Sequence, residues 1–253
     1  MSLRDVPPEV RALYGNLEHA LNTEDSDGRR FGDAKFGVYC FYDFDEEPIY
    51  VGQTREALRT RVRRHLTNQR TDAVAMFVLD PYEVHSLEMW PFWELEDRDA
   101  RDPEAKRLMS RAEWTVYEQA VRASRFGAVL NEGDIARDDP IELPSSYRAV
   151  IAPAGWEDRS EHPDVRIARR AQTFWQLTKV ASERDVSVGL LRTVVVQAQR
   201  LLFQAGQRYQ QLGGTDMELD FGVQLPEYGE TVPGAADEDE ECEGATGDAH
   251  RGS

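Results

Sequence analysis

Hydrophobic positions recur with helical spacing at two places early in the chain. Apolar residues stand three or four positions apart between Pro8 and Leu21, and four apart between Arg55 and about Asn68. This spacing puts the apolar side chains on one face, so each segment is predicted to be an amphipathic helix. The apolar stripes are Val10, Leu13, Leu17 and Leu21 in the first helix, and Leu58, Val62 and Leu66 in the second.

The segment FGVYCFYDFDEEPIYVGQT lies between these helices and has a different pattern. Two apolar, aromatic-rich runs flank the acidic turn DFDEEP, which is typical of a β-hairpin. Residues 82–95 form a third predicted strand, in which Pro91 indicates an edge position or the end of the strand. Thr54 is a suitable N-cap for the helix that follows. The pattern predicts an α+β fold with a small antiparallel three-stranded sheet flanked by helices.

The pattern is again helical in the second half of the chain. One helix is predicted from Pro103 to about Ser124, and a helical region follows from Val165 to about Leu212 with a break at 185–187. Residues 178–200 are spaced like a helix-turn-helix, whereas their apolar seam favours a helical packing or dimerisation element. That seam consists of Val194, Ala198, Leu201, Ala205 and Tyr209.

Changes in composition divide the chain into five regions. The C-terminal end is low in complexity and acidic, so it is predicted to be disordered. The regions are an N-terminal helix and connector (1–30), an α+β domain (31–140), a loop-like linker (141–164), an all-helical C-terminal domain (165–230) and the acidic tail (231–253).

The net charge of −17 is unevenly distributed. From Asp216 to the end there are twelve acidic residues and one basic residue. Residues 55–70 carry six arginines and one acid, and residues 159–208 carry nine basic residues and four acids. Local basic patches of this kind either contact phosphate or form ordinary solvated helix faces, so an acidic chain can still bind nucleic acid.

Other features bear on location and metal chemistry. No apolar run approaches the ~18 residues of a membrane span, and the N-terminus lacks a signal peptide, so we expect a cytoplasmic protein without membrane contact. A structural disulfide between Cys40 and Cys242 is not expected, because the latter lies in the acidic tail. The five histidines lack paired metal-ligand spacing.

The chemistry-bearing residues gather around the predicted hairpin. Tyr39 and Tyr50 stand on its two strands with ten residues between them. Arg61 and His65 lie one turn apart on the next helix, away from its apolar stripe. A guanidinium can neutralise charge that develops on phosphorus, and an imidazole can relay a proton. These are two functions that phosphodiester cleavage needs.

The order GVY, ten residues, YVG and then RTRVRRHL resembles the signature of the GIY-YIG nuclease family, with Val38 and Val51 in place of isoleucine. The resemblance covers about residues 36–132. It implies a DNA endonuclease that uses one Mg²⁺ (or Mn²⁺) ion per site. It also implies Tyr39 as general base, Arg61 as transition-state stabiliser, and Tyr50 and His65 as hydrogen-bonding groups. Many members have a lysine where this chain has Gln53.

The family also has a metal-binding glutamate on a later helix, followed by an asparagine that braces the site. Asn131 matches the asparagine, and Glu118 and Glu113 are the two choices for the glutamate. Glu118 follows two apolar residues and precedes Asn131 by thirteen positions, as in relatives similar to the bacterial excision-repair nuclease domain. Glu113 has apolar neighbours at helical spacing that would hold it rigidly. Spacing makes Glu118 the predicted metal ligand.

The expected partner is DNA, and the expected role is restriction or anti-phage defence. A homodimer or higher oligomer through the C-terminal helices would supply two cutting sites for two strands. The alternatives are DNA repair, mobile-element cutting, RNA cleavage, and a catalytically degenerate module that binds nucleic acid or protein without cutting.

Overall fold

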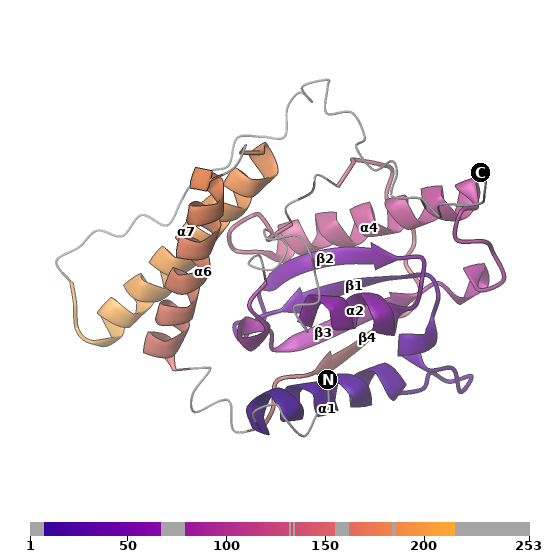
Figure 1. Cartoon of the computed structure of the whole chain (residues 1–253), viewed down its shortest axis with the longest axis horizontal. Coiled ribbons are helices and arrows are strands. Elements are labelled where there is room, and N and C mark those ends of the chain that lie inside the picture. Colours follow the sequence, from indigo (N-terminus) through magenta and orange to yellow (C-terminus); the bar gives the residue numbers. More distant parts are fainter. Residues whose placement is uncertain are drawn as a thin grey trace, which may run out of the picture. The chain divides into compact units, whose positions relative to one another are not determined.

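Four antiparallel strands form one sheet in the order β2-β1-β3-β4 (Figure 1). The computed structural model describes residues 8–66, 79–131, 133, 135–154, 162–183 and 186–215, and all of these fall in one compact unit, Met1–Val223. The tail predicted to be disordered (231–253) lies outside the described residues, as does Cys242. The strands are β1 (Gly37–Tyr42), β2 (Pro48–Thr54), β3 (Ser86–Pro91) and β4 (Tyr147–Val150).

The predicted hairpin is confirmed as β1 and β2. Tyr39 lies opposite Gly52 in the register, with an irregularity between Phe41 and Tyr42. The turn is held by Asp43, whose Oδ1 accepts hydrogen bonds from the backbone N–H groups of Asp45 (2.8 Å) and Glu47 (3.1 Å). Carboxylates commonly bond their own chain two residues on in this way, which explains why an acidic segment makes this turn.

The predicted number of strands is wrong, because β4 is a fourth strand within the predicted linker. It is four residues long and pairs with β3 at the edge of the sheet. Such a short segment has no recognisable period of its own, and pairing with β3 makes it a strand. The third strand is also shorter than predicted, because 3₁₀ turns at Pro81–Glu83 and Trp93–Leu95 bound β3.

Helices cover both faces of the sheet. Helix α4 (Pro103–Ala123) packs on one face, where Met109, Ala112 and Val116 form a buried core with the alternate residues of β1 and β2. Helix α2 (Leu58–Leu66) lies on the other face. It approaches so closely that a Cβ on Gly37 would lie 2.8 Å from the Leu58 side chain. The GVY motif therefore requires its glycine for packing.

The predicted helix boundaries largely hold. Helix α1 (Pro8–Asn22) and α4 match the predictions within one residue. Helix α2 begins at Leu58 rather than Arg55, and the Thr54 hydroxyl accepts a hydrogen bond from Glu56 N (3.1 Å) in the turn before it. No helix in the described part of the chain is long and apolar enough to cross a membrane.

Helices α6 (Pro163–Glu183) and α7 (Val188–Gln211) form an antiparallel pair (Figure 1). Asp164 at the start of α6 accepts from Arg208 at the end of α7 (2.8 Å), which fixes this direction. Of the two alternatives, the pair therefore favours the helical packing element. Large apolar side chains stand exposed on α7 and just beyond it, at successive separations of three, four, seven and ten residues: Val188, Leu191, Val195, Leu202 and Leu212. The homodimer stays a prediction.

The α6–α7 pair is joined to the hairpin turn by buried ion pairs. Asp43 is 1% exposed, and its Oδ2 accepts from Arg170 (2.9 Å) and Arg200 (2.5 Å) and lies 3.5 Å from Arg166. Burial lowers the pKa of Arg200 to about 10, although Asp43 opposes this shift. Three arginines of the predicted basic segment 159–208 are thus buried inside the protein, where they cannot contact phosphate.

Candidate active site

Tyr39 and His65 form the centre of the site. Both are buried, and the Tyr39 hydroxyl lies 2.6 Å from His65 Nε2. The Tyr50 ring completes an aromatic group, with its centroid 4.7 Å from that of His65 and 6.3 Å from that of Tyr39. The hairpin and α2 therefore bring together three of the six predicted site residues.

Gly52 makes the position of Tyr39 possible. The two residues are partners across the hairpin, and the Tyr39 side chain lies over the Gly52 backbone. A Cβ at residue 52 would overlap the Tyr39 hydroxyl and come within 3.1 Å of Tyr50. The YVG motif therefore has a physical reason for its glycine, which is the close approach of a tyrosine to the backbone.

Burial raises the pKa of Tyr39 well above its ordinary value, and the neighbouring Tyr50 adds to the shift. Arg61 opposes the shift through its charge and through a hydrogen bond to Tyr39. Tyr39 is consequently a protonated phenol at neutral pH. It can accept a proton from water only if its own proton leaves, and His65 Nε2 is in position to receive it.

Arg61 has an unused hydrogen-bond donor. Its Nε is buried and has no hydrogen-bond partner among the described residues. Buried polar atoms are usually paired, so this N–H has capacity for a water molecule or a ligand. A guanidinium binds phosphate or carboxylate oxygens, and an anion is therefore the ligand that this atom fits.

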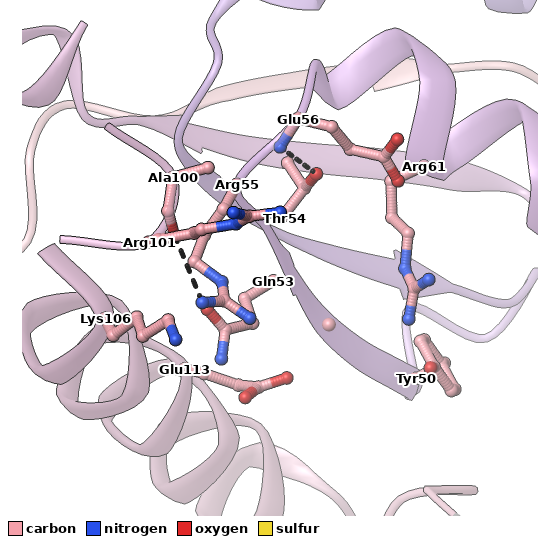
Figure 2. Close-up of a pocket in the computed structure, with 11 residues that line it drawn as sticks. Tyr50, Gln53, Thr54, Arg55, Glu56, Arg61, Ala100, Arg101, Lys106 and Glu113 are labelled. Atoms are coloured by element: carbon pink, nitrogen blue, oxygen red, sulfur yellow. Dashed lines mark hydrogen bonds between the residues drawn. The ribbon is translucent and has the colours of Figure 1, made fainter. Parts of the chain in front are cut away.

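Arg61 lines an open cavity of about 590 Å³ at the end of the hairpin (Figure 2). Tyr50, Gly52 and Gln53 of β2 and Glu113 of α4 line the same cavity. A volume of this size is in the range of ligand-binding pockets, ~300–1,000 Å³. The cavity thus lies along β2, where this strand, α2 and α4 meet, whereas buried Tyr39 and His65 do not line it.

Of the two glutamates, Glu113 lies in this cavity. It is partly buried, and burial raises its pKa to about 7, although hydrogen bonds from Gln53 and the charge of Arg61 oppose the shift. Glu118, the predicted metal ligand, does not line the cavity and pairs with Arg122 (2.7 Å) one turn along α4. The geometry of the cavity therefore favours Glu113 over Glu118, and the choice between them stays a prediction.

Glu113 and Gln53 offer oxygen atoms that fit a hard divalent cation. Gln53 Oε1 is buried without a hydrogen-bond partner among the described residues, and it belongs to the same residue that hydrogen-bonds to Glu113. Hard cations take oxygen ligands, and Mg²⁺ usually keeps several waters. No group of three His, Cys, Asp or Glu side chains in the described part of the chain forms a complete cage. A cation held here would therefore keep water ligands.

Asn131 supports β2 from the outer edge of the sheet. Its side chain accepts from Val51 N (3.0 Å) and donates to Val51 O (2.7 Å), and Leu130 N donates to Ile49 O (2.8 Å). Val51 lies between Tyr50 and Gly52, so Asn131 holds the strand that carries these residues. Asn131 does not line the cavity, and its position is that of a positioning residue.

Three further cations line the cavity that motif reasoning did not single out: Arg55, Arg101 and Lys106. Arg101 and Lys106 lie some forty to fifty residues beyond the hairpin, and only the fold brings them beside it. The spacing Lys106 to Glu113, seven residues on one helix, is the one signal that could have linked Lys106 to the site.

The sequence matches no family model, no curated protein and no solved structure. The interpretation of the site therefore depends on its own geometry and on the resemblance of its motifs.

Proposed function

We propose that this chain is a metal-dependent endonuclease of the GIY-YIG type that hydrolyses phosphodiester bonds in DNA. The observation that carries the proposal is Arg61, which hydrogen-bonds to Tyr39, lines a cavity shared with Tyr50 and Glu113, and has a buried Nε without a hydrogen-bond partner among the described residues. This donor fits a phosphate oxygen. The Tyr39–His65 pair beside it offers the proton transfer that hydrolysis requires.

Proton transfer would run through two side chains. Water gives a proton to the Tyr39 oxygen while the Tyr39 proton passes to His65 Nε2, 2.6 Å away. The water oxygen bonds to phosphorus, the bond from phosphorus to the leaving oxygen breaks, and the leaving oxygen takes a proton from solvent. His65 then replaces the family lysine, whose position is held by Gln53.

The guanidinium of Arg61 would neutralise negative charge on the phosphate. Burial lowers the pKa of Arg61, but the neighbouring Tyr39, Tyr50 and Glu56 together raise it above its ordinary value, so the guanidinium stays charged. In the transition state it would neutralise the equatorial oxygens, and Tyr50 at the cavity wall would hydrogen-bond the water or the phosphate.

Glu113 and Gln53 would hold the metal, and this replaces Glu118 as the proposed ligand. A bound Mg²⁺ or Mn²⁺ supplies Lewis-acid stabilisation to the phosphate and the leaving oxygen. The carboxylate of Glu113 and the unpartnered Oε1 of Gln53 are neighbouring oxygens of residues that line the cavity.

Restriction or anti-phage defence is the proposed role, and a homodimer through α7 belongs to the same proposal. One site cuts one strand, so a double-strand break needs two. The exposed apolar stripe on α7 supports pairing between two copies. Sedimentation equilibrium of the full chain and of Leu191→Glu tests it, and a wild-type monomer at all concentrations would contradict it.

Plasmid nicking tests the nuclease directly. Modified and unmodified supercoiled plasmids should be incubated with Mg²⁺, Mn²⁺ or EDTA, and the ends sequenced. We expect metal-dependent nicking that Arg61→Ala reduces by about 10²–10³, with Arg122→Ala as an exposed arginine control. DNA binding without nicking under every condition would instead support the catalytically degenerate binding module.

A further inference from the structure

Three cations of the cavity have no carboxylate partner. Arg55, Arg101 and Lys106 form no ion pair with any residue in the described ranges, and the one hydrogen bond of these side chains runs from Arg55 to the Ala100 carbonyl (3.3 Å). All three are exposed. Like-charged side chains that gather without counter-charges favour an anionic ligand.

Most of the described arginines in the two basic segments have an acidic partner. Arg64 pairs with Glu56 (2.6 Å), and Arg63 pairs with Glu18 (2.5 Å). The same holds for further members of these segments, each of which has an Asp or Glu partner: Arg59, Arg166, Arg169, Arg170, Arg200 and Arg208. These arginines are thus neutralised by acids, whereas Arg55, Arg101 and Lys106 line the cavity without a carboxylate partner among the described residues.

The cavity has two sides. In Figure 2, Arg61 and Tyr50 lie on one side of Glu113, and Lys106, Arg101 and Arg55 lie on the other, around Gln53. Two acids line it, Glu113 and Glu56, and Glu56 already pairs with Arg64. The lining is therefore positive on both sides of Glu113, and about 590 Å³ is more room than one phosphate group needs.

We propose that Arg55, Arg101 and Lys106 form a second-phosphate site, which binds the phosphate adjoining the scissile one on the same DNA strand. The inference rests on the proposed function, because it takes Arg61 and Glu113 as the place of cleavage. The positive side chains of the second-phosphate site attract the DNA phosphates and donate hydrogen bonds to their oxygens. The site therefore adds affinity for DNA without sequence preference.

DNA binding in EDTA tests the second-phosphate site without cleavage. A fluorescein-labelled 30-base-pair duplex is titrated with the full chain at several NaCl concentrations. Lys106→Ala and Arg101→Ala should each weaken binding several-fold and lower the slope of log K against log salt by about 1. Arg107→Ala is the matched control, since Arg107 is exposed on α4 next to Lys106 but does not line the cavity. It should bind as the wild type does.

Kinetics separate this site from the place of cleavage. Lys106→Ala should raise KM and leave kcat close to that of the wild type, whereas Arg61→Ala should lower kcat. If the wild type cuts DNA but Lys106→Ala and Arg101→Ala match Arg107→Ala in affinity and salt slope, the second-phosphate site is overturned alone. If these variants bind DNA more weakly but the wild type never cuts, the proposed nuclease activity is wrong, whereas phosphate binding by Arg101 and Lys106 is supported.

A chemical probe gives the final test. After the cut is mapped, single neutral methylphosphonates are placed at the phosphates on either side of the scissile one. One of them should weaken wild-type binding but should have no further effect on the Lys106→Ala Arg101→Ala double variant. Equal losses for both proteins at both positions would overturn the proposal.

Discussion

The Tyr39 hydroxyl lies 2.6 Å from Nε2 of His65, and this contact joins strand β1 of the hairpin to helix α2. Both side chains are at most 5% exposed, so bulk water has little access to the proton between them. Burial raises the pKa of Tyr39, so the phenol does not lose its proton to bulk water at neutral pH, and His65 Nε2 is the group placed to accept it. The predictions that follow begin from this pair.

His65→Ala should abolish most of the cleavage and leave DNA binding intact. The variant removes the acceptor for the Tyr39 proton, and loss of acid–base assistance costs about 10²–10⁴ in rate. Tyr39→Phe should behave in the same way. His19→Ala, at an exposed position of α1, is the control. A His65→Ala enzyme with wild-type kcat would remove His65 from the proton path.

Glu113→Gln should eliminate Mg²⁺-dependent cleavage, whereas Glu118→Gln should cut almost as fast as the wild type. Glutamine is a weaker ligand for a hard cation, so high Mg²⁺ or Mn²⁺ should restore part of the rate of Glu113→Gln. Glu118 pairs only with exposed Arg122, and its loss should be a surface effect. The reverse ranking in a metal titration would return the ligand role to Glu118.

Glu113 also predicts a pH dependence of stability in the absence of metal. Its pKa is about 7 in the folded protein and 4.5 ordinarily, so the folded state binds more protons between these values. The contribution of this group is fully present below pH 4.5 and is lost as the pH rises through 7. Melting temperatures in EDTA should therefore fall more over this range for the wild type and Glu118→Gln than for Glu113→Gln. Parallel curves for all three would contradict the raised pKa.

Gly52→Ala should impair catalysis far more than folding. The new methyl group must displace the Tyr39 hydroxyl, which lies over residue 52, and so disturb its contact with His65. Gly15→Ala is a useful comparison because nothing lies within 4 Å of its added Cβ. In an exposed helix interior it should stabilise the protein by about 1 kcal/mol. Equal activity of the two variants, measured beside their melting curves, would argue against close packing at Gly52.

Asp43→Asn should destabilise the fold strongly. It leaves buried Arg166, Arg170 and Arg200 without their shared carboxylate, and breaking a buried ion pair typically costs about 3–5 kcal/mol. Arg208→Ala, which removes an exposed pair with Asp164, should change stability little. Urea unfolding measures both. A loss for Asp43→Asn no larger than that for Arg208→Ala would show that the network contributes little.

Local patterns predicted those elements that are long or strongly periodic. The stripes of α1 and α2, the two runs of the hairpin and the helix after Pro103 all carry their period within the segment itself. Strand β4 does not, because its four residues become a strand only beside β3. The fourth strand therefore could not be predicted from periodicity.

The candidate site was predictable only where motif and local geometry coincide. Four site residues lie on consecutive elements, so their closeness in space could be predicted from their closeness in the sequence. They are Tyr39, Tyr50, Arg61 and His65. Glu113 and Glu118 are on the same helix, and only the rotation of α4 against β2 puts Glu113 in the cavity. Whether an arginine of the two basic segments is paired with an acid or available to phosphate likewise depends on acidic residues far away in the sequence.

The hydrogen bond from Arg200 to Asp43 joins residues 157 positions apart, and this bears on how the protein is made. A nascent chain that ends before Pro163 already contains every proposed catalytic residue, but none of the three arginines that contact Asp43. On the ribosome, the Asp43 carboxylate therefore stays hydrated until α6 and α7 emerge. Until then the hairpin turn lacks its ion pairs with the three arginines. The proposed site is therefore fully supported only after α7 has been synthesised, and a fragment that ends before α6 carries the hairpin without the arginines that hold its turn.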